Sequence, residues 1–205
     1  AEDITYPFSI TTTSLTANDN FTFTLSASGT FYVDCGDGGT LSQNNVTITG
    51  AISRENNTNN DTYKCAWSNS GTHTIRFGGV VTRYNSDVDI PTISFSSSAT
   101  KIKSLSGDLS KLFTTNDNIG TPRFIGTFSG ASSLTSIPET LFTDYTTSTN
   151  QMFKETFKNC DSLQEIPHVL FSNITASAPS LFEYTFSGCS SLTTIPSDLF
   201  SGLTD

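Results

Sequence analysis

The fold class of this chain depends on a phrase that it contains three times: FSGASSLTSIPETLF (residues 128–142), FKNCDSLQEIPHVLF (157–171) and FSGCSSLTTIPSDLF (186–200). The copies start at residues 128, 157 and 186, so the period is constant at 29 residues. A fixed period in this range, with apolar residues at fixed offsets, predicts a solenoid. In such a fold each unit buries its apolar side only against its neighbours.

Each unit predicts the same local structure. Two phenylalanines and a threonine recur at spacings i, i+3 and i+4, which places them on one face of a short helix. The sets are Phe124, Thr127 and Phe128; Phe153, Thr156 and Phe157; Phe182, Thr185 and Phe186. A glycine or asparagine then ends the helix, and a short strand such as Leu134–Ile137 follows and stops at proline. Shifting the register back by one period predicts a degenerate first repeat over residues 101–113.

The repeated phrase resembles bacterial leucine-rich repeats of the BspA type, over roughly Lys101 to Phe200. That resemblance implies a short strand in each unit. It also implies a bacterial cell-surface protein that acts as an adhesin for host matrix proteins or other cells. The last phrase ends at Phe200 with no polar capping unit after it. We therefore expect the chain to continue, or a second copy to associate through this repeat.

The N-terminal half reads as all β. Residues alternate between apolar and polar in Phe21–Leu25, Val46–Ile48 and Thr72–Phe77, which predicts strands with one buried face. Turn-forming residues lie between them, so we expect a small β-sandwich. The predicted fold class is mainly β with short helices: a β-sandwich over residues 1–95 followed by a leucine-rich-repeat solenoid over residues 96–205, packed against each other.

Part of this half resembles PKD-type immunoglobulin-like modules. The likeness lies in Phe31–Gly38, where a hydrophobic strand runs into a Gly-Asp-Gly turn, and in Tyr63 with the later strand Gly71–Phe77. Cys35 stands where those modules usually have an aromatic residue. The resemblance implies a spacer or an adhesion-stalk unit of an extracellular protein.

Composition restricts the possible partners. The net charge is −9, and only 10 Lys and Arg residues are spread over 205 positions, which disfavours nucleic acid. Charged residues make up 14% of the chain, and serine, threonine and asparagine replace them at the surface, a style typical of exported proteins. No apolar run approaches the roughly 20 residues needed to cross a bilayer.

The four cysteines fall into two kinds. Cys160 and Cys189 occupy the slot that Ala131 fills in the first phrase, so this slot is expected to be a small buried apolar site. Cys35 and Cys65 lie in the other half, and the sequence leaves open whether they are bonded, because Cβ geometry decides this.

No pattern in the sequence points to catalysis or to a cofactor. His73 and His168 are expected at the surface, and neither has a second ligand at a metal-binding spacing. Asp34 and Asp37 flank the glycine turn and offer oxygen ligands for Ca²⁺, but Asp-Gly is ordinarily a turn former, which is the reading we favour. Trp67 is expected in the core.

The sequence therefore predicts a non-enzymatic extracellular protein that binds protein or glycan ligands. The expected contact surface comprises the loops 143–150 and 172–180, where the repeats differ most. The candidate binding residues are Tyr145, Asn150, Asn173 and Tyr184. The alternatives are a structural spacer without a specific ligand and a carbohydrate-binding accessory module.

Overall fold

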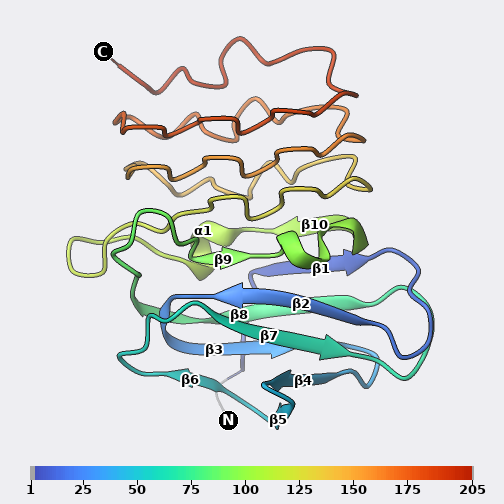
Figure 1. The fold of residues 1–205 in the computed structure, drawn as a ribbon. Helices are drawn as coiled ribbons and strands as arrows, with labels where there is room; N and C mark the ends of the chain where they lie inside the picture. The colour runs from blue at the N-terminus through green and yellow to red at the C-terminus, as the bar shows by residue number, and fades with distance from the viewer. Residues whose placement is uncertain (1–2, 205) are drawn as a thin grey trace.

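The computed structural model describes residues 3–204, and its strands form two five-stranded antiparallel sheets (Figure 1). The first sheet has the order β10-β1-β8-β3-β6 and the second the order β5-β4-β7-β2-β9. The strands are β1 (Phe8–Thr12), β2 (Asn20–Leu25), β3 (Ser28–Asp34), β4 (Thr40–Gln43), β5 (Val46–Ile48), β6 (Ile52–Arg54), β7 (Asp61–Ala66), β8 (Thr74–Arg83), β9 (Ile93–Ser94) and β10 (Ile102–Gly107). A 3₁₀ helix, η1 (Ser96–Lys101), and one helical turn, α1 (Leu109–Leu112), complete the elements.

The alternating stretches form strands because each has one apolar face to bury. In β2 every second residue is buried, and Phe21 and Phe23 pair with Cys65 and Tyr63 of β7. The strands expected over residues 21–25 and 46–48 are thus present, and the one expected over 72–77 begins at Thr74. The sheets pack face to face, which gives the β-sandwich.

The predicted leucine-rich-repeat solenoid is wrong. Such a fold needs a strand in each repeat, but every strand of the described chain lies within residues 8–107. The chain from 114 to 204 forms consecutive turns, and the helices expected around Phe124, Phe153 and Phe182 are absent from it. The φ angle is positive at Gln151, Glu155 and Asn159, every fourth residue, which prevents continuous helix. The fold is a β-sandwich that carries stacked turns at one end.

These turns form three layers, visible above the sandwich in Figure 1, which we call turn layer 1 (residues 122–150), turn layer 2 (151–179) and turn layer 3 (180–204). Along each layer, backbone N–H groups alternate between an acceptor in the same layer and an acceptor in the next layer. The N–H of Lys154 donates within its layer to the carbonyl of Gln151 (3.1 Å), whereas the N–H of Phe153 donates to the carbonyl of Leu181 in the next layer (2.9 Å). Backbone hydrogen bonding thus joins the layers without a β-strand.

Threonine and cysteine side chains add a second set of bonds between layers. The Thr156 hydroxyl donates to the carbonyl of Phe124 (2.8 Å), and the Thr185 hydroxyl donates to the carbonyl of Phe153 (2.8 Å). Both threonines are buried. Their spacing from the phenylalanines, which we interpreted as a helix face, instead satisfies a carbonyl of the preceding layer.

One hydrophobic core runs through the sandwich and the layers. The rings of Phe95, Phe128, Phe157 and Phe186 stack in a column with centroids 5.4–5.6 Å apart. Two further stacks run through the layers: Phe124, Phe153 and Phe182; Phe142, Phe171 and Phe200.

Turn layer 1 is also bonded to the sandwich. The N–H of Phe95, directly after β9, donates to the carbonyl of Thr127 (2.8 Å). β10 lies beyond the predicted domain boundary at residue 95 but pairs with β1, so one sheet uses strands from both sides of that boundary. The division into two domains stays a prediction. Among the helices of residues 3–204, none has the length and apolar character required to span a bilayer.

Candidate functional site

The expected contact loops lie along one side of the turn layers, together with the segment 114–121. We call residues 114–121, 143–150 and 172–180 the loop surface. Asn150 and Asn173 are exposed there, and the Asn173 side-chain amide donates to the carbonyl of Thr143 (2.7 Å). Tyr184 lies outside these loops and is 58% exposed, with the Lys158 ammonium 5.7 Å from its ring centroid. Three of the four candidate binding residues are therefore accessible.

Tyr145 is the exception, because its side chain is buried rather than exposed as we expected. Its hydroxyl donates to the carbonyl of Phe113 (2.8 Å), and its ring packs near Phe124 with centroids 5.8 Å apart. Burial raises the pKa of the Tyr145 hydroxyl well above its ordinary value. Tyr145 therefore anchors the 143–150 loop to the core and presents no ring to a ligand.

Two adjoining hollows occupy the loop surface. The first, about 390 Å³, is lined by Thr115, Asn116, Asp117, Gly120, Thr121, Thr146 and Thr147. The second, about 300 Å³, shares Gly120 and Thr121 and is completed by Tyr84, Asn85, Ser86, Ile119, Arg123 and Thr149. Hydroxyl and amide groups dominate both linings, so the hollows offer hydrogen-bond donors and acceptors at short range.

Arg123 holds the second hollow together. Its Nε donates to the carbonyl of Asn150 (3.1 Å), and its two terminal nitrogens donate to the carbonyl of Asn85 (3.2 Å) and the hydroxyl of Thr149 (3.3 Å). Burial lowers the pKa of this guanidinium. The side chain thus fixes the 143–150 loop against the segment after β8 and supplies a positive charge at the wall of the hollow.

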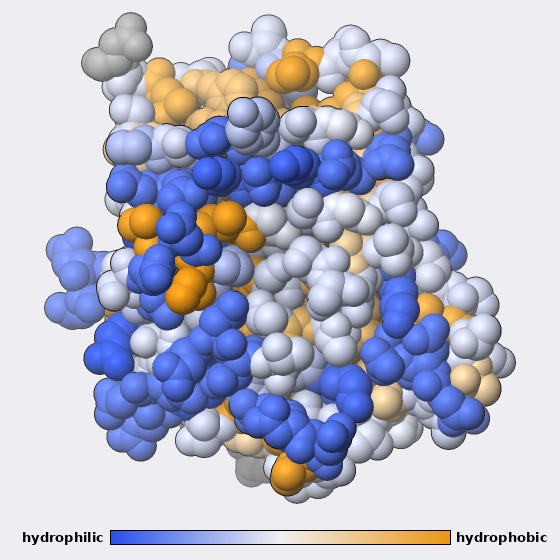
Figure 2. Space-filling model, viewed as in Figure 1, coloured by the Kyte–Doolittle hydropathy of each residue, from blue (hydrophilic) through white to orange (hydrophobic). Residues whose placement is uncertain are grey.

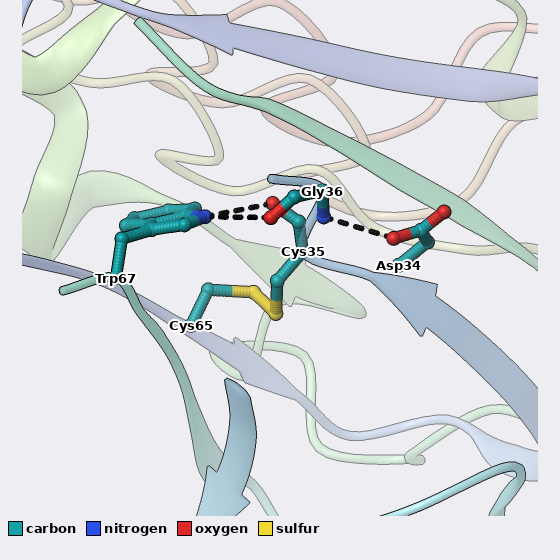
Figure 3. Close-up of a disulfide and its surroundings, with 5 residues drawn as sticks. All are labelled: Asp34, Cys35, Gly36, Cys65 and Trp67. Carbon is teal, nitrogen blue, oxygen red and sulfur yellow. Dashed lines mark hydrogen bonds between the residues drawn. A yellow bond between two sulfur atoms is a disulfide. The ribbon is translucent and has the colours of Figure 1, made fainter. Parts of the chain in front are cut away.

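The Asp34–Asp37 turn is occupied by contacts within the protein. The Asp34 carboxylate accepts hydrogen bonds from Arg76 and from the N–H of Gly36 (2.8 Å; Figure 3), which lower the pKa of Asp34. The Asp37 carboxylate lies 3.0 Å from His73 Nδ1. Residues 3–204 contain no cluster of three or more His, Cys, Asp or Glu that would suit a metal ion. The preference for a turn former over a Ca²⁺ site stays a prediction, and an ion there would compete with Arg76 for Asp34.

His73 is buried, so its predicted place at the surface is wrong. Its ring stacks on Trp67 with centroids 4.3 Å apart and planes 4° apart. Trp67 is buried as expected, and its Nε1 donates to the carbonyls of Cys35 and Gly36, both at 3.0 Å (Figure 3). His168 is exposed as expected, with Nδ1 at 3.0 Å from Asp198.

The four cysteines are of two kinds, one bonded pair and two free thiols. Cys35 and Cys65 form a disulfide that joins the end of β3 to β7 (Figure 3), which answers the question left open by the sequence. Cys160 and Cys189 are free and buried. The interaction with Cys189, together with burial, raises the pKa of the Cys160 thiol.

Arg54 is a structural residue that the sequence analysis missed. Its side chain is buried, its Nε donates to the carbonyl of Ala27 (2.8 Å), and one terminal nitrogen donates to Asp61 and to the Tyr63 hydroxyl (both 2.7 Å). The alternation Ile52-Ser53-Arg54 could have predicted the burial of Arg54, because it puts Arg54 on the same buried face as Ile52.

No protein-family model matches this chain, and neither a characterised protein nor a solved structure is significantly similar to it.

Proposed function

We propose that this chain is a non-enzymatic, extracellular binding protein of the adhesin type, and that it contacts a protein or glycan ligand through the loop surface. The observation that carries the proposal is the pair of adjoining polar hollows between the 114–121 and 143–150 loops. Loops held by a rigid scaffold are common sites of recognition. Here Arg123 and Tyr145 fix the loops to that scaffold.

The chemistry of the hollows suits a ligand rich in hydrogen-bonding groups. Thr121, Thr146 and Thr147 supply hydroxyls, and Asn116 supplies an amide donor, because its side-chain oxygen already accepts from the N–H groups of residues 118 and 119. Such groups match peptide backbones and polar side chains, and they equally match sugar hydroxyls. A bacterial surface protein is the setting that the resemblance to BspA-type repeats and PKD-type modules suggests, and it remains part of this proposal.

The disulfide supports an extracellular location. Disulfides persist in oxidising compartments and are rare in the cytosol. The Cys35–Cys65 bond is buried beside Trp67, which protects it from reductants. The abundance of serine, threonine and asparagine in a chain with only 14% charged residues agrees with this location.

Screening the whole chain against arrays of matrix proteins and of glycans tests the proposal. Ligands found on the array are then measured with Thr147→Tyr, which fills the first hollow from an exposed position. Thr47→Tyr is the matched control, because Thr47 is an exposed threonine on β5 in the sandwich. We expect at least tenfold weaker binding for Thr147→Tyr and no change for Thr47→Tyr. No binding across both arrays, or equal binding by both variants, would reject the loop surface as the contact site.

A structural spacer is the second candidate. The sandwich is joined to the turn layers by the aromatic column of Phe95, Phe128, Phe157 and Phe186. A spacer needs such a rigid connection in order to project another part of a protein. A chain that stays monomeric and fails to bind on both arrays would favour this function.

A further inference from the structure

The outer face of turn layer 3 differs from the faces inside the stack. Phe153, Phe157 and Phe171 of turn layer 2 are buried, and Ile166 is nearly so. Their counterparts one period later are partly or largely accessible, and Ile195 and Phe200 reach 63% and 39% exposure. Figure 2 shows hydrophobic residues along the upper end of the molecule, where Figure 1 places the last layer. A hollow of about 290 Å³ lies on this face between Phe186, Leu192 and Ile195.

The same face carries a row of backbone N–H groups with a defined direction. In turn layer 2 the N–H groups of residues 151, 153, 155, 157 and 159 donate to the carbonyls of residues 179, 181, 183, 185 and 187 at 2.7–2.9 Å. The equivalent groups in turn layer 3 belong to Ser180, Phe182, Tyr184, Phe186 and Gly188. These five N–H groups find no acceptor within residues 3–204. Water can accept from these groups while the face is exposed, and a partner that presents backbone carbonyls at the same spacing could accept from all five.

The turn layers of a folded second copy do not present such a row. Two turn layers 3 placed face to face would bring N–H groups against N–H groups. At the opposite side of the stack, the carbonyls of Arg123 and Thr127 in turn layer 1 already accept from Thr92 and Phe95 of the sandwich. The predicted self-association through the last repeat thus lacks complementary hydrogen bonding.

The internal interfaces show which segment does fit. Turn layer 2 covers turn layer 1, and turn layer 3 covers turn layer 2, with the same contacts each time. In both cases the carbonyls of the covering layer accept from the N–H groups of the layer beneath it. Phenylalanine rings of the two layers also stack on each other. A threonine hydroxyl also donates to the carbonyl of the first phenylalanine below, and a cysteine thiol to that of the second, as Cys189 does to Phe157 (3.0 Å). An added layer would therefore need a threonine hydroxyl to donate to the carbonyl of Phe182 and a cysteine thiol to donate to the carbonyl of Phe186.

We propose that the outer face of turn layer 3 binds a polypeptide segment with the pattern Phe-x-x-Thr-Phe-x-x-Cys, which adds to the stack as a further turn layer. The segment's carbonyls accept from the row at Ser180–Gly188, and its rings stack on Phe182, Phe186 and Phe200. Its threonine donates to the carbonyl of Phe182. This mode resembles the addition of a strand to an open sheet edge, because main-chain bonds supply affinity and side-chain positions supply specificity.

A synthetic peptide with the sequence of residues 149–176 tests the proposal, because this segment covers turn layer 1 within the chain. Binding to the whole chain is measured by calorimetry. The contact is located by amide hydrogen exchange. We expect saturable binding and slower exchange at Phe182, Tyr184 and Phe186. Replacing the threonine of the peptide that corresponds to Thr156 by valine should weaken binding about tenfold, the effect of losing one buried hydrogen bond.

Variants of the chain provide the matched control. Ile195→Glu places a charge on the outer face at an exposed position and should abolish peptide binding. Val80→Glu makes the same kind of change on β8 of the sandwich, where Val80 is 68% exposed, and should leave binding unchanged. Equal binding of a scrambled peptide, or no binding at millimolar concentration, would overturn the proposal. A peptide-independent dimer that Ile195→Glu disrupts would assign the face to a second copy and would also overturn it.

Discussion

The rings of Phe157 and Phe186 lie almost parallel, with planes 2° apart and centroids 5.6 Å apart, yet only Phe157 is fully buried. Phe157 is stacked on both sides, since the Phe128 ring lies 5.4 Å from it on the other side. Phe186 has a neighbouring layer on one side alone. Two residues at the same place in the repeat therefore differ in how much of their surface is removed from water.

Alanine substitutions should reproduce this difference in burial. Phe157→Ala leaves a cavity between two layers and should lower the free energy of unfolding by about 3–5 kcal/mol. Phe186→Ala removes a side chain that already contacts solvent and should cost about 1–2 kcal/mol, because the gap opens to water. Urea unfolding followed by circular dichroism measures both values. Equal losses would show that the outer face is covered in solution.

The bond from Thr156 to the layer below should be worth about as much as other buried hydrogen bonds. Thr156→Val keeps the shape of the side chain but leaves the Phe124 carbonyl with one donor fewer, so we expect a loss of about 1–2 kcal/mol in unfolding free energy. Thr156→Ser retains the hydroxyl and should lose less. Thr147→Val changes an exposed threonine and should stay within about 0.5 kcal/mol of the parent chain.

The disulfide should stabilise the sandwich by restricting the unfolded chain. Cys35 and Cys65 are separated by 30 residues, and closing a loop of this size contributes about 2–4 kcal/mol. The double variant Cys35→Ala/Cys65→Ala should lose this amount in denaturant unfolding. Cys189→Ala is the control, because Ala131 already fills the same slot in turn layer 1, and its loss should be clearly smaller. A double variant as stable as the parent chain would show that the bond adds nothing.

The sandwich could be predicted from the sequence because alternation along a strand is a local property. Phe21 and Phe23 are buried with period two, as the pattern indicated. The same rule would have placed His73 beside Ile75 and Arg54 beside Ile52 on buried faces. We expected His73 at the surface because of its residue type. In the structure His73 Nδ1 lies 3.0 Å from the Asp37 carboxylate, and the buried Arg54 donates to Asp61.

The turn layers could not be distinguished from helices by spacing. Residues at i, i+3 and i+4 share a face in a helix, and Phe153, Thr156 and Phe157 also point inward in overlapping turns. The two structures differ in the acceptors of alternate N–H groups, such as that of Phe153, which depend on the next layer along the chain. The hollows of the loop surface were missed for a similar reason, since the 114–121 loop lies far in sequence from Thr146 and Thr147.

The Asp34 carboxylate should make the stability of the sandwich depend on pH in the acid range. The hydrogen bond from Arg76 lowers the pKa of Asp34 in the folded chain below its ordinary value of 3.8. The folded state then binds fewer protons than the unfolded state, so the stabilisation is fully present above pH 3.8 and is lost as the pH falls through the folded-state pKa. Asp34→Asn removes the charge but keeps an oxygen that can accept from the Gly36 N–H.

We expect Asp34→Asn to be less stable than the parent chain at pH 7 by about 0.5 kcal/mol, because exposed ion pairs contribute little. The difference should shrink toward zero below pH 3 and should also decrease in 1 M salt, which screens the pair. Urea unfolding at pH 7, 4 and 2.5 measures it. A difference that stays constant over this range would show that the substitution acts through packing or backbone geometry and that the charge of Asp34 contributes nothing.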